Sequence, residues 1–293
     1  MPAAGATPAG PRSDGHRLGG SILRPCSGGR QAPAFRWGRL GGSPTSWMLG
    51  RVVEEVLAGG FVSAVVRVGD TVRRPAAPEF VRRLLTFLGE REWAGAPRWL
   101  GVDERGRDVL SYLLGDVPWQ PERHVEVRTE GALARVAGLV RELHDLTAGT
   151  ELAEGGEVVC HNDLSPKNTV YRDGGSGLLP VAFLDWDIAA PGRRVHDVAH
   201  VCWQYVGLGP SVDPARAAGQ VRLLADAYGL DERGELVDAV LWWQDRCWRG
   251  IAAKAAAGDP AMTRLRDRGV VEAIQTDRDW TAAQRGTLER ALR

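Results

Sequence analysis

The residue pattern changes character near Gly115–Pro121, and this change constrains the fold more than any other feature. Before it, strand-like segments at Thr71–Arg74, Arg98–Val102 and Asp108–Leu114 surround a single helical segment, Glu79–Leu88. Strands, helix and strands within about 70 residues predict a small α+β unit. After it, helical spacing dominates. We therefore expect an N-terminal lobe over residues 46–115 and a larger, mainly helical C-terminal lobe over residues 116–293.

The start of the N-terminal lobe carries weaker signals. Met48–Leu57 has helical spacing, and Phe61–Val68 reads as a strand that ends in a tight turn at Gly69–Asp70. Gly59–Gly60 lies between them and does not complete a G-x-G-x-x-G pattern. It is either a turn that covers phosphate or an ordinary loop.

The C-terminal lobe begins with a helical segment that Thr129 can cap and whose apolar stripe runs from Leu133 to Leu143. We then expect, in chain order, three short strands and two long helices: Glu157–Cys160, Thr169–Arg172, Pro180–Leu184, Ala215–Tyr228 and Glu235–Ala257.

Residues 1–45 are rich in Gly, Pro, Ala and Arg, and Asp14 is their only acid. Such a segment buries too little apolar surface to offset its ordering entropy, so we expect disorder. It is alternatively sequence upstream of a true start at Met48. A basic arm for nucleic acid is a third option, which the scattered arginines do not favour.

Charge and cysteine content exclude several classes of protein. The chain has 37 basic and 37 acidic residues, so no net field attracts nucleic acid or an acidic membrane surface. The four cysteines contain no C-x-x-C pair, which indicates reduced thiols rather than disulfides or a zinc site. The apolar run Val56–Val66 is too short to span a bilayer, and no secretory leader is recognisable. We expect a cytoplasmic protein that binds neither nucleic acid nor membrane, with an oligomeric state that the sequence leaves open.

The stretch His161–Asn168, followed by Phe183–Asp187, carries the chemistry. An Asp two residues after a His, at a strand-to-loop transition, is well placed to accept a proton. A hairpin can bring Asn168 and Asp185 to the same edge, where an amide oxygen and a carboxylate suit Mg²⁺ bound to phosphates. A base, an amide and a metal carboxylate are the groups that phosphoryl transfer requires. The alternative is that Asp163 and Asp185 are ordinary turn residues.

These residues resemble the aminoglycoside phosphotransferase family, a branch of the protein-kinase-like fold. That family has an H-x-D-x-x-x-x-N loop and then an Asp after an apolar strand, and both occur here. Arg194–Ala199 is similar to the family's D-[IL]-A segment. The resemblance covers roughly Trp47 to Arg293 and implies a two-lobed α+β kinase-like fold. It also implies that ATP or GTP binds between the lobes together with Mg²⁺.

The resemblance also implies a role for each matching residue. Asp163 would orient or deprotonate the acceptor hydroxyl, and Asn168 and Asp185 would bind Mg²⁺. His161 would brace the loop and Asp197 would anchor it. Lys167, which follows the base by four residues, either touches the transferred phosphate or faces solvent.

The N-terminal lobe departs from the kinase pattern because it contains no lysine; the chain's only lysines are Lys167 and Lys254. Kinases place a Lys on the third strand. By strand alternation, Val72 and Arg74 share a face here, so Val72 can pack on adenine while Arg74 reaches the phosphates. A register slip of one residue would give that role to Arg73.

Glu79, at the start of the following helix, is the candidate partner for this arginine, with Glu90 and Glu92 as weaker ones. The alternative is that these arginines and Glu79 form a solvated surface cluster. Tyr112 and Leu113, in the strand that leads to the second lobe, are expected to lie near adenine.

Two further features of the C-terminal lobe stay open. His196 and His200 are spaced like the histidines of an H-E-x-x-H zinc motif, but no third ligand follows, so ordinary helix residues are favoured. Trp243 lies on an apolar stripe, whereas Trp242 does not and is a candidate for lining a substrate site. Asp238 and Asp245 are candidates for attracting a cationic acceptor.

The sequence thus predicts an ATP-dependent phosphotransferase that moves the γ-phosphate to a hydroxyl of a small molecule. A positively charged acceptor is one option. The alternative is a kinase-like pseudoenzyme that binds a nucleotide or small metabolite without transfer. Fold-level resemblance does not identify the acceptor.

Overall fold

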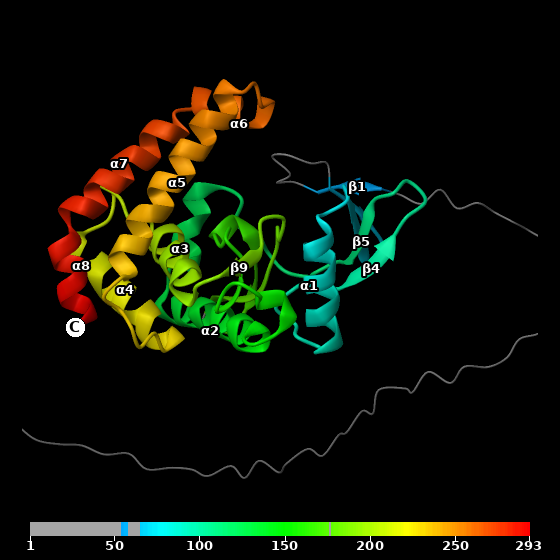
Figure 1. Cartoon of the computed structure of the whole chain (residues 1–293), viewed down its shortest axis with the longest axis horizontal. Helices are drawn as coiled ribbons and strands as arrows, with labels where there is room; N and C mark the ends of the chain where they lie inside the picture. The colour runs from blue at the N-terminus through cyan, green and yellow to red at the C-terminus, as the bar shows by residue number, and fades with distance from the viewer. Residues whose placement is uncertain (1–53, 58–64, 176) are drawn as a thin grey trace, which may run out of the picture. The chain divides into compact units, whose positions relative to one another are not determined.

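A computed structural model describes residues 54–57, 65–175 and 177–293, which all belong to one structural unit, Arg51–Arg293. Its N-terminal part is an antiparallel five-stranded sheet of order β1-β2-β3-β5-β4 with one helix, α1 (Figure 1). The elements are β1 (Glu55–Val56), β2 (Val66–Val68), β3 (Thr71–Arg74), α1 (Glu79–Glu90), β4 (Trp99–Val102) and β5 (Asp108–Ser111).

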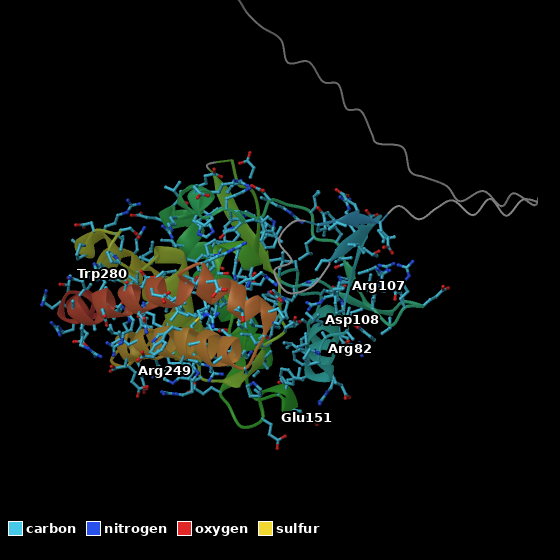
Figure 2. All side chains as sticks on the ribbon, turned by 90° about the horizontal axis from the view of Figure 1, so that it is seen from above. Arg82, Arg107, Asp108, Glu151, Arg249 and Trp280 are labelled. Atoms are coloured by element: carbon cyan, nitrogen blue, oxygen red, sulfur yellow. The ribbon has the colours of Figure 1, made fainter. Side chains whose placement is uncertain are left out.

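A buried carboxylate ties helix α1 to this sheet. Asp108 is 1% exposed and forms an ion pair with Arg82 of α1 at 2.8 Å (Figure 2). It also accepts hydrogen bonds from the backbone N–H of Ala77 at 2.7 Å and from the Trp99 indole at 3.3 Å. A buried carboxylate is tolerated only when it is paired and hydrogen-bonded in this way. Asp108 therefore has a structural role.

The prediction of a helix over Met48–Leu57 is wrong where it can be compared with the structure. Glu55 and Val56 form a strand that pairs with Arg67 and Val66 of β2. Pairing with β2 supplies backbone hydrogen bonds to an existing strand, whereas a short, weakly periodic helix forms too few to offset the cost of its nucleation. Residues 48–53, Gly59–Gly60 and 61–64 lie outside the described residues.

The C-terminal part is mainly helical, as the fold prediction required. Its first elements are η1 (Pro121–Val127), a 3₁₀ helix, and α2 (Glu130–Thr147). The expected cap of α2 is present, since the Thr129 side chain accepts from the backbone N–H of Ala132. The elements that follow are η2 (Glu151–Ala153), β6 (Val158–Cys160), η3 (Pro166–Asn168), β7 (Thr169–Asp173), β8 (Leu178–Phe183) and β9 (Ala190–Gly192).

Two small antiparallel sheets position the loops of interest. Strands β7 and β8 form a hairpin in which Thr169 pairs with Phe183, so the residues that precede β7 and follow β8 emerge at one edge. Strand β9 pairs with β6. The sequence did not predict β9, because Ala-Pro-Gly has low strand propensity and forms a strand only through this pairing.

Six helices complete the described part of the chain, in the order α3 (Arg194–Val206), α4 (Pro214–Tyr228), α5 (Leu236–Ala256), α6 (Pro260–Asp267), α7 (Val270–Ala283) and α8 (Arg285–Leu292). Helix α5 packs along α7, and α2 packs against α4 (Figure 1). Their apolar faces join one core that includes Leu133, Leu143, Val201, Leu224 and Trp243. Among the described helices, none is both long enough and apolar enough to cross a membrane.

Candidate active site

The loop between β6 and β7 is organised around His161, which is fully buried. Its Nε2 lies 3.0 Å from the backbone oxygen of Leu184, and its Nδ1 accepts from the backbone N–H of Asp163 at 3.3 Å. Burial lowers the pKa of His161, so the ring is neutral at pH 7 and Nε2 donates. The ring also packs against Trp186, with centroids 4.4 Å apart. His161 thus joins the loop to the segment after β8.

Asp163 and Asn168 are in direct contact. The side-chain N–H₂ group of Asn168 donates to the backbone oxygen and to the carboxylate Oδ2 of Asp163, in both cases at 2.9 Å. Asn168 is 3% exposed, so this contact is shielded from solvent. With the amide nitrogen engaged, the amide oxygen of Asn168 is the atom available to a cation.

The β7–β8 hairpin brings Asn168 and Asp185 together. The backbone N–H of Leu184 donates to the backbone oxygen of Asn168 at 2.8 Å. Asp185 is the next residue after Leu184, so it lies close to Asn168. Asp185 has a φ of 61°, a left-handed conformation that Asp and Asn adopt more readily than most residues. The expected arrangement at one edge of the hairpin is therefore present.

The electrostatics at this edge suit a hard cation. Asp185 keeps an exposed surface, yet the protein packed around it raises the pKa of its carboxyl, and the charges of Asp187 and Asp163 raise it further. The Oδ1 atom of Asp187 is buried and has no hydrogen-bond partner among the described residues. Crowded carboxylates beside an amide oxygen are a donor set that fits Mg²⁺.

Arg74 reaches the same edge from the N-terminal sheet. Its Nη2 forms an ion pair with Oδ2 of Asp187, and its Nε is buried without a hydrogen-bond partner among the described residues. Arg73 points elsewhere: its Nη1 donates to Thr71 Oγ1 at 2.6 Å, and its Nε lies 3.8 Å from Asp103. The geometry favours Arg74 over Arg73 as the arginine next to the carboxylates. Phosphate binding by either residue stays a prediction.

The remaining predicted nucleotide residues are placed as follows. Glu79 is exposed at the start of α1, and the ion pair of Arg74 is formed with Asp187 instead. Val72 is half-buried and packs against the core on the face of β3 that it shares with Arg74. At the end of β5, the guanidinium of Arg67 covers the Tyr112 ring at 3.9 Å, and Leu113 is half-buried beside it.

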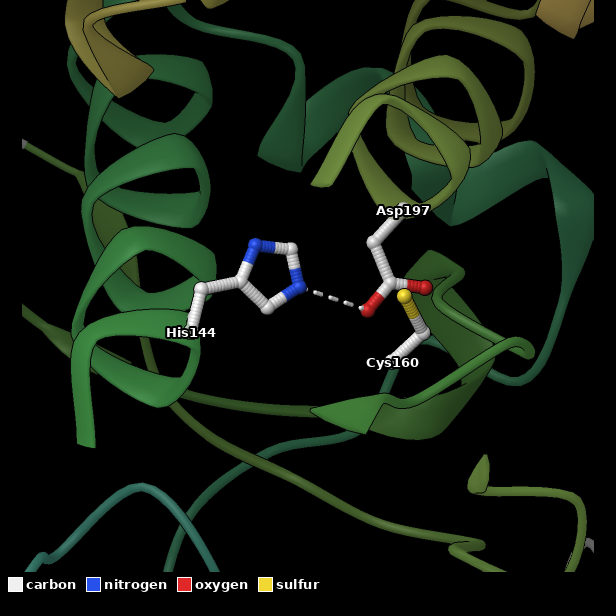
Figure 3. A group of neighbouring side chains, drawn as sticks. All are labelled: His144, Cys160 and Asp197. Carbon is white, nitrogen blue, oxygen red and sulfur yellow. Dashed lines mark hydrogen bonds and ion pairs between the residues drawn. The ribbon is translucent and has the colours of Figure 1, made fainter. Parts of the chain in front are cut away.

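Asp197 lies behind the loop and is fully buried. It accepts hydrogen bonds from the backbone N–H groups of His161 at 2.7 Å and Asn162 at 2.9 Å, and contacts His144 Nε2 at 3.2 Å (Figure 3). Burial alone would raise the pKa of Asp197, but the hydrogen bonds from His144 and from the backbone N–H of Asn162 lower it overall. Asp197 therefore anchors the loop.

His144, Cys160 and Asp197 form the one grouping among the described residues with enough clustered ligand atoms to suggest a metal (Figure 3). Both oxygens of Asp197 already accept backbone hydrogen bonds. Burial raises the pKa of the Cys160 thiol strongly, so it stays protonated and donates to the backbone oxygen of Arg193 at 3.3 Å. Each of the three side chains has hydrogen-bond partners within the protein, so this cluster is a buried hydrogen-bond network.

The zinc interpretation of His196 and His200 gains no support either. His200 is buried and contacts the backbone oxygen of Leu164 through Nδ1 at 2.8 Å. His196 stacks on Trp242, with centroids 5.1 Å apart and an interplanar angle of 15°. Asp197, which lies between them in sequence, accepts hydrogen bonds from the backbone of the loop. These are helix residues that pack beside the site, as the favoured interpretation held.

Sequence reasoning missed two residues near this site, Asp187 and Cys247. Asp187 is two residues after Asp185, so its proximity could have been found from the local sequence alone. Burial raises the pKa of the Cys247 thiol on α5, and the nearby charge of Asp163 raises it further. No pattern in the sequence indicates that proximity, because it depends on how α5 packs.

Together, the fold and the site define a kinase-like protein in which Asp163 and Asn168, from the loop between β6 and β7, lie at the same hairpin edge as Asp185. Residues 69–236 match the phosphotransferase enzyme family APH, and the chain belongs to this family. The trifolitoxin immunity protein of Rhizobium leguminosarum bv. trifolii is 33% identical over 274 residues. That match covers 82% of this chain and 98% of the relative.

Solved structures show the same fold at low identity. A choline/ethanolamine kinase family protein from Mesorhizobium loti has a TM-score of 0.53 at 18% identity, covering 85% of this chain and 94% of that one. An ethanolamine kinase from Plasmodium vivax has a TM-score of 0.55 at 11% identity, covering 80% and 83%. The aminoglycoside phosphotransferase APH(3'')-Id from Streptomyces rimosus, in complex with ADP and streptomycin, has a TM-score of 0.50 at 15% identity, covering 67% and 91%.

Proposed function

We propose that this protein transfers the γ-phosphate of ATP or GTP to a hydroxyl group of a small molecule. One observation carries the proposal: the Asp163–Asn168 contact lies at the same hairpin edge as Asp185 and Asp187. A proton acceptor beside a set of cation ligands is the arrangement that phosphoryl transfer uses. Membership of the phosphotransferase family supports the reaction class.

Each site residue has a distinct role in the proposed reaction. Asp163 accepts the proton of the acceptor hydroxyl while the hydroxyl oxygen attacks the γ-phosphorus. The bond between the γ-phosphorus and the oxygen of the nucleoside diphosphate breaks, and the diphosphate leaves. Asn168 and Asp185 would hold Mg²⁺, which neutralises phosphate charge. Arg74 binds a phosphate oxygen through its guanidinium. His161 keeps the loop in register with the segment after β8.

Thermal-shift titrations with Mg·ATP and Mg·GTP, followed by nucleotide-consumption assays over an acceptor panel, test the proposal. The panel contains streptomycin, ethanolamine and choline, which the names of the structural neighbours suggest, and trifolitoxin, which the name of the relative suggests. We expect nucleotide binding and acceptor-dependent turnover that Asp163→Asn removes. Turnover that Asp163→Asn leaves intact would contradict the assignment.

The second candidate is a pseudoenzyme that binds nucleotide or a small metabolite without transfer. The absence of lysine from residues 46–115 motivates it, because kinases use a lysine on the third strand. Saturable nucleotide binding without turnover on any acceptor of the panel would favour this candidate.

A further inference from the structure

Arg74 on β3 has its counter-charge far along the chain rather than in its own sheet or in the helix that follows. Its Nη2 forms an ion pair with Oδ2 of Asp187, which lies 113 residues later, after β8. The Arg74 side chain is only 14% exposed. A mostly buried cation needs a partner of opposite charge, so Asp187 determines where this guanidinium lies.

Helix α1, which packs on the same sheet, offers Arg74 no carboxylate. The only acids of α1 are Glu79 and Glu90, both exposed, and neither forms an ion pair with a described residue. The ion pair between helix and sheet has the opposite polarity, since α1 supplies Arg82 and β5 supplies the buried Asp108. The helix is thus joined to the sheet without holding Arg74 in place.

Asp187 extends from a segment that packing holds in place. Its neighbour Trp186 is buried, and the Trp186 indole donates to the backbone oxygen of Phe183 at 3.1 Å. The same ring lies against His161, with centroids 4.4 Å apart, and packs edge-to-face with Trp93 at 6.3 Å. A side chain that is packed on several sides fixes the backbone that carries it. The backbone from which the Asp187 carboxylate extends is therefore fixed relative to the loop between β6 and β7.

The Arg74–Asp187 contact is a link between the two halves of the candidate site. Within the described part of the chain, no other Lys or Arg forms an ion pair with Asp163, Asp185 or Asp187. Lys167, on the same loop as Asp163, is exposed and forms no ion pair with a described residue. One ion pair thus connects the N-terminal sheet with the segment that carries Asp185.

An arginine that is held in position beforehand binds a phosphate more tightly than a freely rotating one, because less entropy is lost on binding. The contact with Asp187 engages one nitrogen of the guanidinium and leaves further N–H groups for a phosphate oxygen. Without Asp187, the guanidinium would be a mostly buried cation with no carboxylate partner, and it would turn toward water.

We propose that Asp187 is the positioning residue of Arg74 and holds its guanidinium where the nucleotide phosphates bind. Asp187 has the role for which the sequence suggested Glu79. Because Asp185 lies in the same fixed segment, one structural element places both the arginine and the cation ligand. This inference rests on the proposed function, in which Arg74 binds a phosphate oxygen.

Isothermal titration with ATP and with GTP in EDTA tests this role apart from any contact of Asp187 with Mg²⁺. Asp187→Asn removes a negative charge near the phosphates, which by itself strengthens binding of the anionic nucleotide. Loss of the position of Arg74 acts in the opposite direction, and we expect it to dominate and to raise the dissociation constant about fivefold. Asp187 is partly exposed, so the variant should fold, and its melting temperature checks this.

Two matched variants complete the comparison. Asp185→Asn removes a charge from the same segment but leaves the partner of Arg74 in place, so it should bind metal-free nucleotide at least as tightly as the unchanged protein. Glu79→Gln should leave the affinity unchanged, because the ion pair of Arg74 is formed with Asp187. Asp187→Glu keeps the charge and should retain part of the affinity that Asp187→Asn loses.

A double-mutant cycle tests whether Asp187 acts through the arginine. In protein that already carries Arg74→Ala, Asp187→Asn should cause no further weakening, with or without Mg²⁺. Additive losses would overturn the inference, and the cycle decides the question in Mg²⁺ if metal-free nucleotide binds too weakly to titrate.

Metal-free binding that Asp187→Asn leaves unchanged or strengthens would also overturn the inference, as would weaker binding in Glu79→Gln. A protein that binds neither nucleotide, with or without Mg²⁺, would overturn the proposed function and this inference together. Nucleotide binding that depends on Asp187 through Arg74, in a protein that phosphorylates no acceptor, would instead show that the transfer reaction fails while the positioning role stands.

Discussion

The carboxylates on the two sides of the loop between β6 and β7 have opposite environments. Behind the loop, Asp197 is fully buried and accepts two backbone hydrogen bonds, and its pKa is lowered. In front, Asp185 is partly exposed, and its pKa is raised by burial and by the charges of Asp187 and Asp163.

Under the proposed function, this difference separates a structural acid, Asp197, from a ligand-binding acid, Asp185. Asp197 has its charge satisfied by the protein itself, so it stabilises the fold. The charges of Asp187 and Asp163 oppose ionisation of Asp185 more than the charge of Arg74 favours it, so Asp185 would stabilise the fold only when a ligand brings positive charge. Substitutions behind the loop should therefore change stability, and substitutions in front should change binding and turnover.

Asp163→Asn should have the largest effect on function. Loss of the proton acceptor should lower kcat about 10³-fold, within the usual range for general bases. Asn keeps the shape of the side chain, so the melting temperature and nucleotide affinity should not change. Steady-state kinetics and nucleotide titration measure this. Asp231→Asn, at an exposed acid outside the site, is the control and should retain full turnover.

Asp197→Asn should be the most destabilising substitution. Its amide N–H₂ would face backbone donors, which costs about 3 kcal/mol and about 10 °C in melting temperature. The folded pKa of Asp197 lies below its unfolded value of 3.8, so its stabilising contribution is present above that pH and is lost below it. Melts at pH 7 and at pH 3 measure this, and the difference from the unchanged protein should narrow at pH 3.

If Asp197→Asn instead abolished turnover in a protein that melts normally, the contrast between the two sides of the loop would be broken. Asp197 would then belong to the reaction rather than to the framework.

Arg74→Ala should raise the apparent KM for the nucleotide about tenfold, equivalent to 1.4 kcal/mol, and Arg74→Lys should partly restore it. The melting temperature should change little, because partly exposed ion pairs contribute less than about 1 kcal/mol. Arg73→Ala is the matched control, since Arg73 contacts Asp103 and Thr71. A larger effect of Arg73→Ala would reverse the assignment of the two arginines.

Asp185→Asn should produce the smallest change in stability, with a sign opposite to that of Asp197→Asn. The folded pKa of Asp185 lies above 3.8, so its ionised form costs stability at neutral pH and this cost disappears below pH 3.8. With solvent screening, the gain should be under about 1 kcal/mol at pH 7 in EDTA. Asn also tolerates the left-handed backbone here.

Stabilisation by Mg·ATP should be lost in the same variant, and thermal shifts with and without Mg·ATP measure both effects. A variant that is less stable in EDTA at pH 7 would show that Asp185 has a structural role like that of Asp197.

Local features were predictable where chain geometry alone decides them. The spacing of Asn168 and Asp185 around a hairpin placed them at one edge, as β7 and β8 confirm. Strand alternation directed Arg74, rather than Arg73, to the face next to the carboxylates. The helix predicted across Glu55–Val56 was wrong, because pairing with β2 outweighs a weak local preference.

The sequence by itself determined the loop motif, the order of elements and the shortage of lysine. These depend on covalent spacing and on backbone periodicity, which act over a few residues. Only the tertiary structure decided which charges are balanced. It pairs Asp238 and Asp245 with arginines from other helices, and it leaves Nε of Arg74 and Oδ1 of Asp187 without hydrogen-bond partners among the described residues. Charge compensation depends on distance and burial between segments far apart in the chain, which no local pattern encodes.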